Sequence, residues 1–201
     1  MLSPRWGRGQ GENPLSAGGG WRKRLKFWQE SRIRPIRARG RAMSNDRPDP
    51  TFNPLQGGDV PPGERLGMAR RFFEALPHAV ALGMEPEEMG DGVAVMSMPW
   101  REDLVGDPET GVIHGGAVSA LMDTCCGAAA MSHPQLKGVT ATIGLRIDYM
   151  RPATPRATIR VRAECHHITR SVAFVRAIAS DGDETRPVAT ATGTFTVEDR
   201  R

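Results

Sequence analysis

One carboxylate in this chain, Asp123, stands inside a run of otherwise apolar and small residues. The run from Ala117 to Met131 reads Ala-Val-Ser-Ala-Leu-Met-Asp-Thr-Cys-Cys-Gly-Ala-Ala-Ala-Met. Because it is apolar on every face, it predicts a helix that is buried all round rather than an amphipathic surface helix. Burying an unpaired carboxylate costs several kcal/mol or raises its pKa. We therefore expect Asp123 either to be compensated by partners or to be kept for chemistry.

Two glycines, Gly115 and Gly116, come immediately before this run. A glycine lets a ligand approach the main chain, and the first N–H groups of a helix lack internal acceptors and lie at the positive end of the helix dipole. The pair thus fits an oxyanion or anion site, and a tight strand-to-helix turn without a ligand is the simpler alternative. For the preceding residue, His114, we favour a side chain that fixes the turn over a catalytic base.

The basic residues are concentrated at the start of the chain. Residues 1–42 contain eleven Arg or Lys against two Glu, a net charge of +9. The rest contains sixteen basic and twenty-one acidic residues, a net charge of −5. We expect residues 1–62 to form a disordered, basic and Pro-rich extension, and residues 63–201 to form the folded domain.

Four origins are open for the basic segment: a nucleic-acid or membrane-surface arm, an organelle transit peptide, an expression artefact, or an upstream start choice. We favour the upstream start, because Met43 resembles a natural chain start followed by a polar, Pro-rich entry. Nucleic-acid binding is not favoured, since the segment contains no recognisable folded DNA-binding element.

Cysteine and histidine usage argues against a metal site. The three cysteines, two of them adjacent, form neither a disulfide framework nor a C-x-x-C pair, and the five histidines show no ligand spacing. No run approaches the roughly 18 apolar residues needed to span a bilayer. We expect a cytoplasmic protein that needs no metal or cofactor and does not bind a membrane.

Hydrophobic spacing predicts the elements that position these residues. Apolar residues at helical spacing predict a helix over about 64–76, ended near Pro77, and alternation over 91–100 predicts a strand. The apolar helix follows from about 115 to 132, before the break at His133-Pro134.

Four further strands are predicted at the end of the chain, joined by short, turn-like separators. Short separators connect antiparallel neighbours, because a parallel crossover needs a dozen or more residues. We therefore expect an α+β fold in which an antiparallel meander wraps around the apolar helix to bury it. The strands cover about 139–151, 156–168, 171–180 and 186–197.

With these elements in place, the chain resembles the hotdog-fold thioesterases, specifically the phenylacetate-degradation (PaaI-like) type of acyl-CoA thioesterase. The residues that carry the resemblance are His114-Gly115-Gly116, Asp123 nine positions after the histidine, and the run Thr140-Ala141-Thr142-Ile143-Gly144-Leu145-Arg146-Ile147-Asp148-Tyr149-Met150-Arg151-Pro152. The resemblance spans roughly residues 64–198. It implies a sheet wrapped around a long central helix, which agrees with the order of elements derived above.

The resemblance also implies roles for single residues. The backbone N–H of Gly115 would polarise the thioester carbonyl, and Asp123 would act as general base on a water or as nucleophile. Thr142 falls where similar enzymes have a Ser or Thr that helps to orient the water. His114 would hold the turn rather than transfer protons.

Substrate-binding positions are less sharply indicated. Related chains often carry an Asn shortly before His-Gly-Gly, and here either Asp107 or no residue takes that place. Gly116 contributes a second N–H to the anion site, and Arg151 or Arg170, at strand ends, is our guess for the phosphates of coenzyme A. We expect an apolar acyl groove shaped by side chains such as Leu121, Met122 and Met131.

A distance argument favours an oligomer. Gly115 and Asp123 are eight residues apart on one helix, which at about 1.5 Å per residue separates them by roughly 12 Å. One thioester carbon cannot contact both. If both serve one reaction centre they must come from two subunits, so we expect a homodimer or, as in similar hotdog proteins, a homotetramer built as a dimer of dimers.

Two alternatives to acyl-CoA hydrolysis are kept. A hotdog enoyl-CoA hydratase would use an acidic residue and a histidine, and Glu109 stands five positions before His114, but that interpretation leaves Asp123 without a role. A non-catalytic acyl-CoA sensor would bind ligand in the pocket and use the basic segment to contact a partner. The sensor would tolerate Asp123→Asn, whereas a hydrolase would lose turnover.

Overall fold

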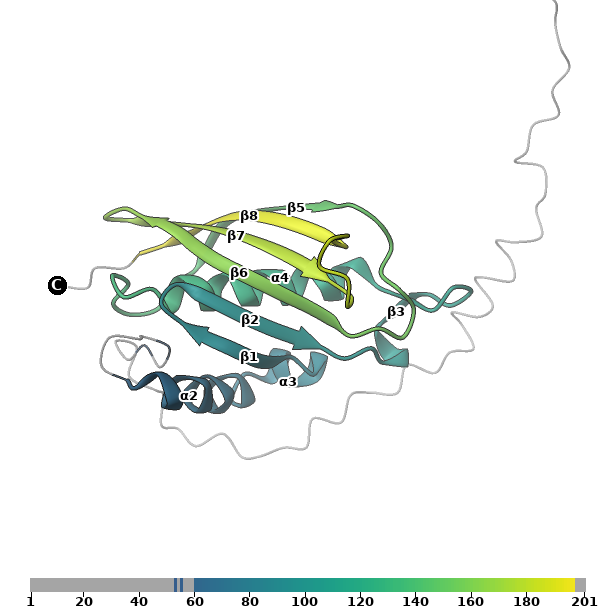
Figure 1. Ribbon diagram of the computed structural model, residues 1–201, viewed down its shortest axis with the longest axis horizontal. Helices are drawn as coiled ribbons and strands as arrows, with labels where there is room; N and C mark the ends of the chain where they lie inside the picture. Colours follow the sequence, from purple (N-terminus) through teal and green to yellow (C-terminus); the bar gives the residue numbers. More distant parts are fainter. Residues whose placement is uncertain (1–52, 54, 56–59, 198–201) are drawn as a thin grey trace, which may run out of the picture. The chain divides into compact units, whose positions relative to one another are not determined.

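A six-stranded antiparallel sheet wraps around one central helix, α4 (Gly115–Met131), in the computed structural model (Figure 1). The structure describes residues 53, 55 and 60–197, so the basic segment 1–42 lies outside the described residues. Strands follow one another across the sheet in the order β1-β2-β6-β7-β8-β5, and β3 and β4 form a separate two-stranded ladder. This arrangement is the α+β fold predicted from the sequence.

Seven of the observed elements correspond to predicted ones. The central helix α4 ends one residue before its predicted bound, α2 is shifted by two residues, and the five strands are shorter than predicted. The helix predicted over 64–76 is α2, the strand predicted over 91–100 contains β2, and the four C-terminal strands are found as β5 to β8. Helix α3 and strands β1, β3 and β4 were not predicted. The bounds are α2 Pro62–Glu74, α3 Pro77–Leu82, β1 Glu85–Gly90, β2 Val93–Met98, β3 Val105–Asp107, β4 Val112–Ile113, β5 Thr142–Tyr149, β6 Ile159–Ile168, β7 Val172–Ser180 and β8 Ala189–Thr196.

The predicted meander is wrong at one strand. β6, β7 and β8 pair in sequence order, but β5 pairs with β8 and not with β6. The segment between β5 and β6 therefore crosses to the far side of β7 and β8, although it contains the turn-like residues Pro152 and Pro155. As a result β5 forms one edge of the sheet, with β8 as its only neighbour in that sheet.

Helix α4 packs its apolar residues against β2, β6 and β7. Ten of its 17 residues are buried, and Leu121, Met122 and Cys125 have no exposed surface. The prediction of burial on every face is wrong for one stripe, because residues that recur every three or four positions remain partly or fully exposed in the single chain. The stripe comprises Gly116, Ser119, Ala120, Asp123, Thr124 and Gly127.

Folded contacts begin before the boundary expected at Gly63. The side-chain amide of Asn53 donates a hydrogen bond to the carbonyl oxygen of Met131 at the end of α4, at 3.0 Å, and Leu55 is buried in the core. Two residues of the segment expected to be disordered are therefore part of the domain's packing. Among the described residues, no helix is long and apolar enough to cross a membrane.

Candidate functional site

The first turn of α4 leaves one backbone N–H without an acceptor. The N–H of Gly116 donates to Nδ1 of His114 at 2.9 Å, and those of Ala117 and Val118 donate to the His114 carbonyl oxygen. Within the described part of the chain, the N–H of Gly115 has no such partner. Because this group lies at the positive end of the helix and is exposed, it is the one first-turn donor available to an oxyanion.

His114 is the N-cap residue of α4. Its Nδ1 accepts the hydrogen bond from Gly116, and its own N–H donates to the carbonyl oxygen of Leu104 at 2.8 Å. An imidazole nitrogen that accepts a hydrogen bond is unprotonated and has its lone pair engaged. This geometry supports the interpretation that His114 holds the turn. It also occupies the Gly116 N–H, so Gly116 gains no support as a second oxyanion donor.

Asp123 and Thr142 lie together at the middle of α4, about two turns after Gly115. The Thr142 hydroxyl, at the start of β5, donates to Oδ1 of Asp123 at 2.9 Å. Asp123 is partly exposed rather than buried in the single chain. The carboxylate thus faces an accessible surface with one hydroxyl beside it, an arrangement suited to holding a water molecule.

The structure keeps Gly115 and Asp123 apart. Gly115 contacts Tyr149, the last residue of β5, whereas Asp123 contacts Thr142, the first. The donor therefore lies at the start of α4 and the carboxylate at its middle, beside opposite ends of β5. This agrees with the helical spacing of roughly 12 Å. One chain thus carries two candidate half-sites: Gly115 with Tyr149, and Asp123 with Thr142.

A pocket of about 400 Å³ lies beside Gly115. The expected groove residues do not form it: Leu121 and Met122 are wholly buried and Met131 nearly so, all three within the core. The pocket lies instead between the start of α4, the end of β5 and the loop after it. Its lining is mostly apolar and comprises Val112, Ile113, Gly115, Val118, Tyr149, Met150, Arg151, Pro152, Ala153 and Val188.

Asp107 builds a turn. Its Oδ1 accepts from the Glu109 N–H at 3.1 Å, and its Oδ2 accepts from the Thr110 hydroxyl at 2.8 Å. These bonds close the loop that brings β3 back to β4. Beside it, a Cβ on Gly106 would lie 2.8 Å from the His114 Cα, so glycine is needed where β3 passes the cap of α4. The geometry supports a structural role for Asp107.

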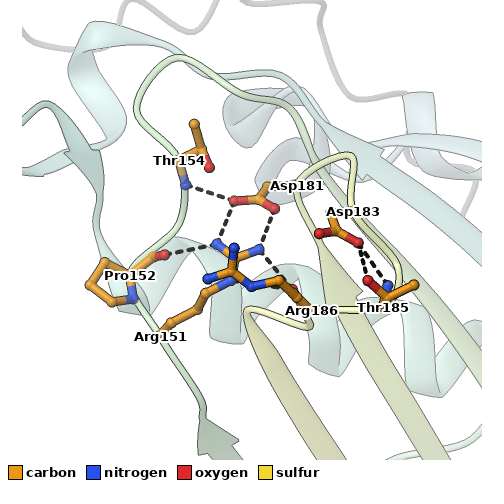
Figure 2. A network of polar contacts seen from close by, with 7 residues as sticks. All are labelled: Arg151, Pro152, Thr154, Asp181, Asp183, Thr185 and Arg186. Carbon is orange, nitrogen blue, oxygen red and sulfur yellow. Dashed lines mark hydrogen bonds and ion pairs between the residues drawn. The ribbon is translucent and has the colours of Figure 1, made fainter.

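Arg151 is held in an ion pair, as Figure 2 shows. Its two terminal nitrogens donate to both carboxylate oxygens of Asp181, at 2.8 and 2.6 Å, and also to the carbonyl oxygens of Pro152 and Arg186. The Asp181 side chain is only 2% exposed and also accepts from the Thr154 N–H. The guanidinium holds the pKa of Asp181 far below its usual range. With its donors engaged, Arg151 gains no support as a phosphate ligand.

Arg170 lies at the other end of the sheet from Arg151. It is exposed in the turn between β6 and β7, where Val172 pairs with Thr196. Arg151 follows Tyr149, which pairs with Ala189 at the far end of β8. The two arginines therefore cannot share one phosphate group within a chain, and Arg170 remains a predicted coenzyme A contact on the Asp123 side.

Sequence reasoning missed Tyr149 and Ser119, which meet at the start of α4. The Tyr149 hydroxyl donates to the Gly115 carbonyl oxygen at 2.6 Å and lies 2.8 Å from the Ser119 hydroxyl. A signal was present: Tyr149 is the single tyrosine of the chain and continues the apolar alternation of Leu145 and Ile147 in the strand predicted over about 139–151.

The comparisons with known proteins agree on one family. Residues 110–188 match the Thioesterase superfamily. A solved Pseudomonas aeruginosa protein is 38% identical over 65% of this chain and 97% of its own, with a TM-score of 0.59. A solved protein from the thioesterase superfamily is 30% identical over 66% of this chain and 98% of its own, with a TM-score of 0.59.

A third solved structure carries a more specific name. A variant of the phenylacetic acid degradation protein PaaI from Thermus thermophilus is 30% identical over 61% of this chain and 99% of its own, with a TM-score of 0.54. The family match over residues 110–188 contains α4 and both Gly115 and Asp123. The chain therefore belongs to the thioesterase superfamily, and its sheet wrapped around α4 is a hotdog fold.

Proposed function

We propose that this protein hydrolyses acyl-CoA thioesters to a free acid and coenzyme A. The observation that carries the proposal is the unpartnered Gly115 N–H at the start of α4, seen among the described residues, beside a mostly apolar pocket of about 400 Å³. In a member of the thioesterase superfamily, this pairing suits a thioester carbonyl next to a hydrocarbon or aryl group.

The chemistry requires few parts, because a thioester is already activated. The carbonyl oxygen accepts the Gly115 hydrogen bond, which strengthens as negative charge develops on that oxygen in the transition state. Asp123 takes a proton from water that Thr142 helps to orient, or attacks the carbonyl carbon itself. The C–S bond then breaks and coenzyme A leaves as the thiolate. If Asp123 acts as base, the proton it took from water passes to the thiolate; if Asp123 acts as nucleophile, the solvent protonates the thiolate and a water molecule then hydrolyses the acyl–Asp123 anhydride to release the acid and restore the carboxylate.

The two half-sites imply a second subunit. Gly115 of one chain would work with Asp123 of the partner subunit, with the two α4 helices antiparallel. Two features support this: the exposed stripe on α4, and the free edge of β5, every residue of which is at least partly exposed. An unpaired strand edge of this length is a template for another strand. We propose a homodimer, with a dimer of dimers as the larger form.

The hydratase alternative is not supported by the geometry around Glu109. Glu109 is exposed in the turn after β3, where its N–H donates a hydrogen bond to the Asp107 carboxylate. It therefore lies on a different element from Gly115. The sensor alternative remains an outcome of the test below. Its distinguishing feature, the basic segment, lies outside the described residues.

The proposal is tested by following thioester absorbance over a panel of acyl-CoAs with the wild type and Asp123→Asn. We expect the variant to lose about 100-fold or more of the turnover rate, since a general base is removed, while calorimetry shows that acyl-CoA binding is retained. Asp148→Asn is the matched control, because Asp148 is an exposed carboxylate on β5 that pairs with Arg146. Binding without turnover by the wild type would favour the sensor.

A further inference from the structure

We propose that Tyr149 is a positioning residue that holds the Gly115 peptide so that its N–H meets the thioester carbonyl. The inference rests on the proposed hydrolase function. The Tyr149 hydroxyl donates to the backbone carbonyl oxygen of Gly115, so Tyr149 acts on the position of the backbone and not in proton transfer.

Two hydroxyl groups converge on one carbonyl oxygen at the start of α4. The Tyr149 hydroxyl donates to the Gly115 oxygen at 2.6 Å, and the Ser119 hydroxyl lies 3.1 Å from the same oxygen. The two hydroxyls are 2.8 Å from each other. A short chain in which Ser119 donates to Tyr149 and Tyr149 to Gly115 satisfies all three oxygens with the two available protons.

The hydrogen bond between Tyr149 and Gly115 connects strand β5 to the start of helix α4. Tyr149 is the last residue of β5, an edge strand, and Gly115 is the first residue of α4. α4 packs far less extensively against β5 than against β6. Among the described residues, three side-chain hydrogen bonds join the pair: the Tyr149 hydroxyl bonds to Gly115 and to Ser119 at the start of α4, and the Thr142 hydroxyl donates to Asp123 at the middle of α4.

A Gly-Gly start needs such a tie. Glycine costs the most backbone entropy on ordering, and the first turn of a helix frays. An oxyanion donor works only when it is held within about 0.5 Å of the productive position. The Gly115 carbonyl and the Gly115 N–H belong to two adjacent peptide units that are joined at the Gly115 Cα. A hydroxyl that fixes the carbonyl therefore limits the rotation of the neighbouring unit that carries the donor.

Tyr149 is also part of the pocket wall, and this gives a rival role. The side chain lines the pocket beside Gly115, and an ideal Cβ on Gly115 would lie 3.4 Å from the Tyr149 hydroxyl oxygen. A residue that served only as wall would affect the binding of the acyl group, and by an amount that differs between acyl groups. A residue that positions the donor would affect the chemical step equally for all of them.

The test compares Tyr149→Phe and Ser119→Ala in the full chain, with acetyl-CoA and a longer acyl-CoA as substrates. Phenylalanine keeps the wall and removes only the hydroxyl. We expect Tyr149→Phe to lower kcat about tenfold, the worth of one hydrogen bond near 1.4 kcal/mol, with KM changed by less than about twofold and the same factor for both substrates. Ser119→Ala should act in the same direction by a smaller factor. Thr192→Ala, at an exposed site on β8, is the control.

Each outcome decides the matter. The inference is overturned if Tyr149→Phe leaves kcat unchanged, or if it changes only KM and by a factor that depends on the acyl group. The proposed function still stands in that case, provided that wild-type turnover is lost in Asp123→Asn. A wild type without turnover on any acyl-CoA refutes the proposed function itself. If Tyr149→Phe does not fold, Ser119→Ala carries the same test, because it removes the hydroxyl that orients Tyr149 and lies 3.1 Å from the Gly115 oxygen.

Discussion

At the scale of single residues, the chemistry depends on which of four first-turn N–H groups is left free. His114 occupies three of them, through Nδ1 for Gly116 and through its carbonyl oxygen for Ala117 and Val118. The Gly115 N–H remains. His114 thus accepts the hydrogen bonds of the N–H groups that follow Gly115 and leaves only the Gly115 N–H, among the described first-turn donors, for the substrate.

The assignment of His114 as a cap can be separated from a role as base. Asparagine is a good N-cap, so His114→Asn should keep kcat within about threefold of wild type, whereas His114→Ala should lower the free energy of unfolding by about 1 kcal/mol. Steady-state kinetics and urea unfolding measure the two effects. A loss of about 100-fold in kcat for His114→Asn in a stable protein would show that the imidazole transfers protons.

The sequence predicted the candidate oxyanion donor and the carboxylate, but it did not predict which residues line the pocket. Gly115 and Asp123 were identifiable because two glycines and one carboxylate stand out beside an apolar helix. Leu121 and Met122 were assigned to the groove, but they face the core. An apolar helix does not reveal which of its faces a sheet covers, and that depends on the long-range pairing of β5 with β8.

At the scale of elements, the strands with clear alternation were predicted and β1 was not. β1 reads Glu-Pro-Glu-Glu-Met-Gly, a composition that strand propensity disfavours. It forms because it lies at a sheet edge, where a proline is tolerated, and because Glu87 and Glu88 form ion pairs with Arg160 and Arg162 of β6. These partners are more than seventy residues away, beyond what local pattern can show.

The crossover between β5 and β6 depends on the Arg151–Asp181 pair. It fastens the start of that connection to the loop between β7 and β8 (Figure 2). Asp181→Asn would put a neutral amide in place of the carboxylate that accepts from both terminal nitrogens of Arg151. Because the Asp181 side chain is only 2% exposed, we expect this change to lower the free energy of unfolding more than a carboxylate-to-amide change at an exposed site does. Denaturant unfolding measures this, with Asp183→Asn in the same loop, an exposed residue, as the comparison. Equal stability of the two variants would contradict the assignment.

The same pair sets an acid limit on stability. The pKa of Asp181 is lower in the folded chain than in the unfolded chain, because Arg151 stabilises the carboxylate. Its contribution is therefore fully present above the ordinary pKa of an aspartate, about 4, and is lost as the pH falls toward the folded-state value. Unfolding free energies of the wild type should fall with decreasing pH in that acid range, and those of Asp181→Asn should fall less steeply. If the unfolding free energies of the wild type and Asp181→Asn fell in parallel with pH, the Asp181 carboxylate would not contribute to the pH dependence.

At the scale of the whole molecule, one chain leaves its chemical surface uncovered. The stripe on α4 consists of small and polar residues that are partly or fully exposed, and β5 beside it exposes the large apolar side chains of Ile143 and Tyr149, although most of α4 is buried. The sequence predicts that this helix is buried on every face, whereas the single chain leaves one face exposed. This difference suggests that a partner covers that face. The sequence alone indicated this only through the spacing of Gly115 and Asp123.

The most direct test of the account mixes two inactive variants. Gly115→Pro removes the N–H at the first helical position, where proline is tolerated, and Asp123→Asn removes the carboxylate. After subunit exchange, a site shared between subunits is intact once in every mixed dimer, which restores about a quarter of wild-type turnover at equal mixing. If each chain carried its own complete site, every site would bear one lesion, and turnover would stay at the level of the separate variants.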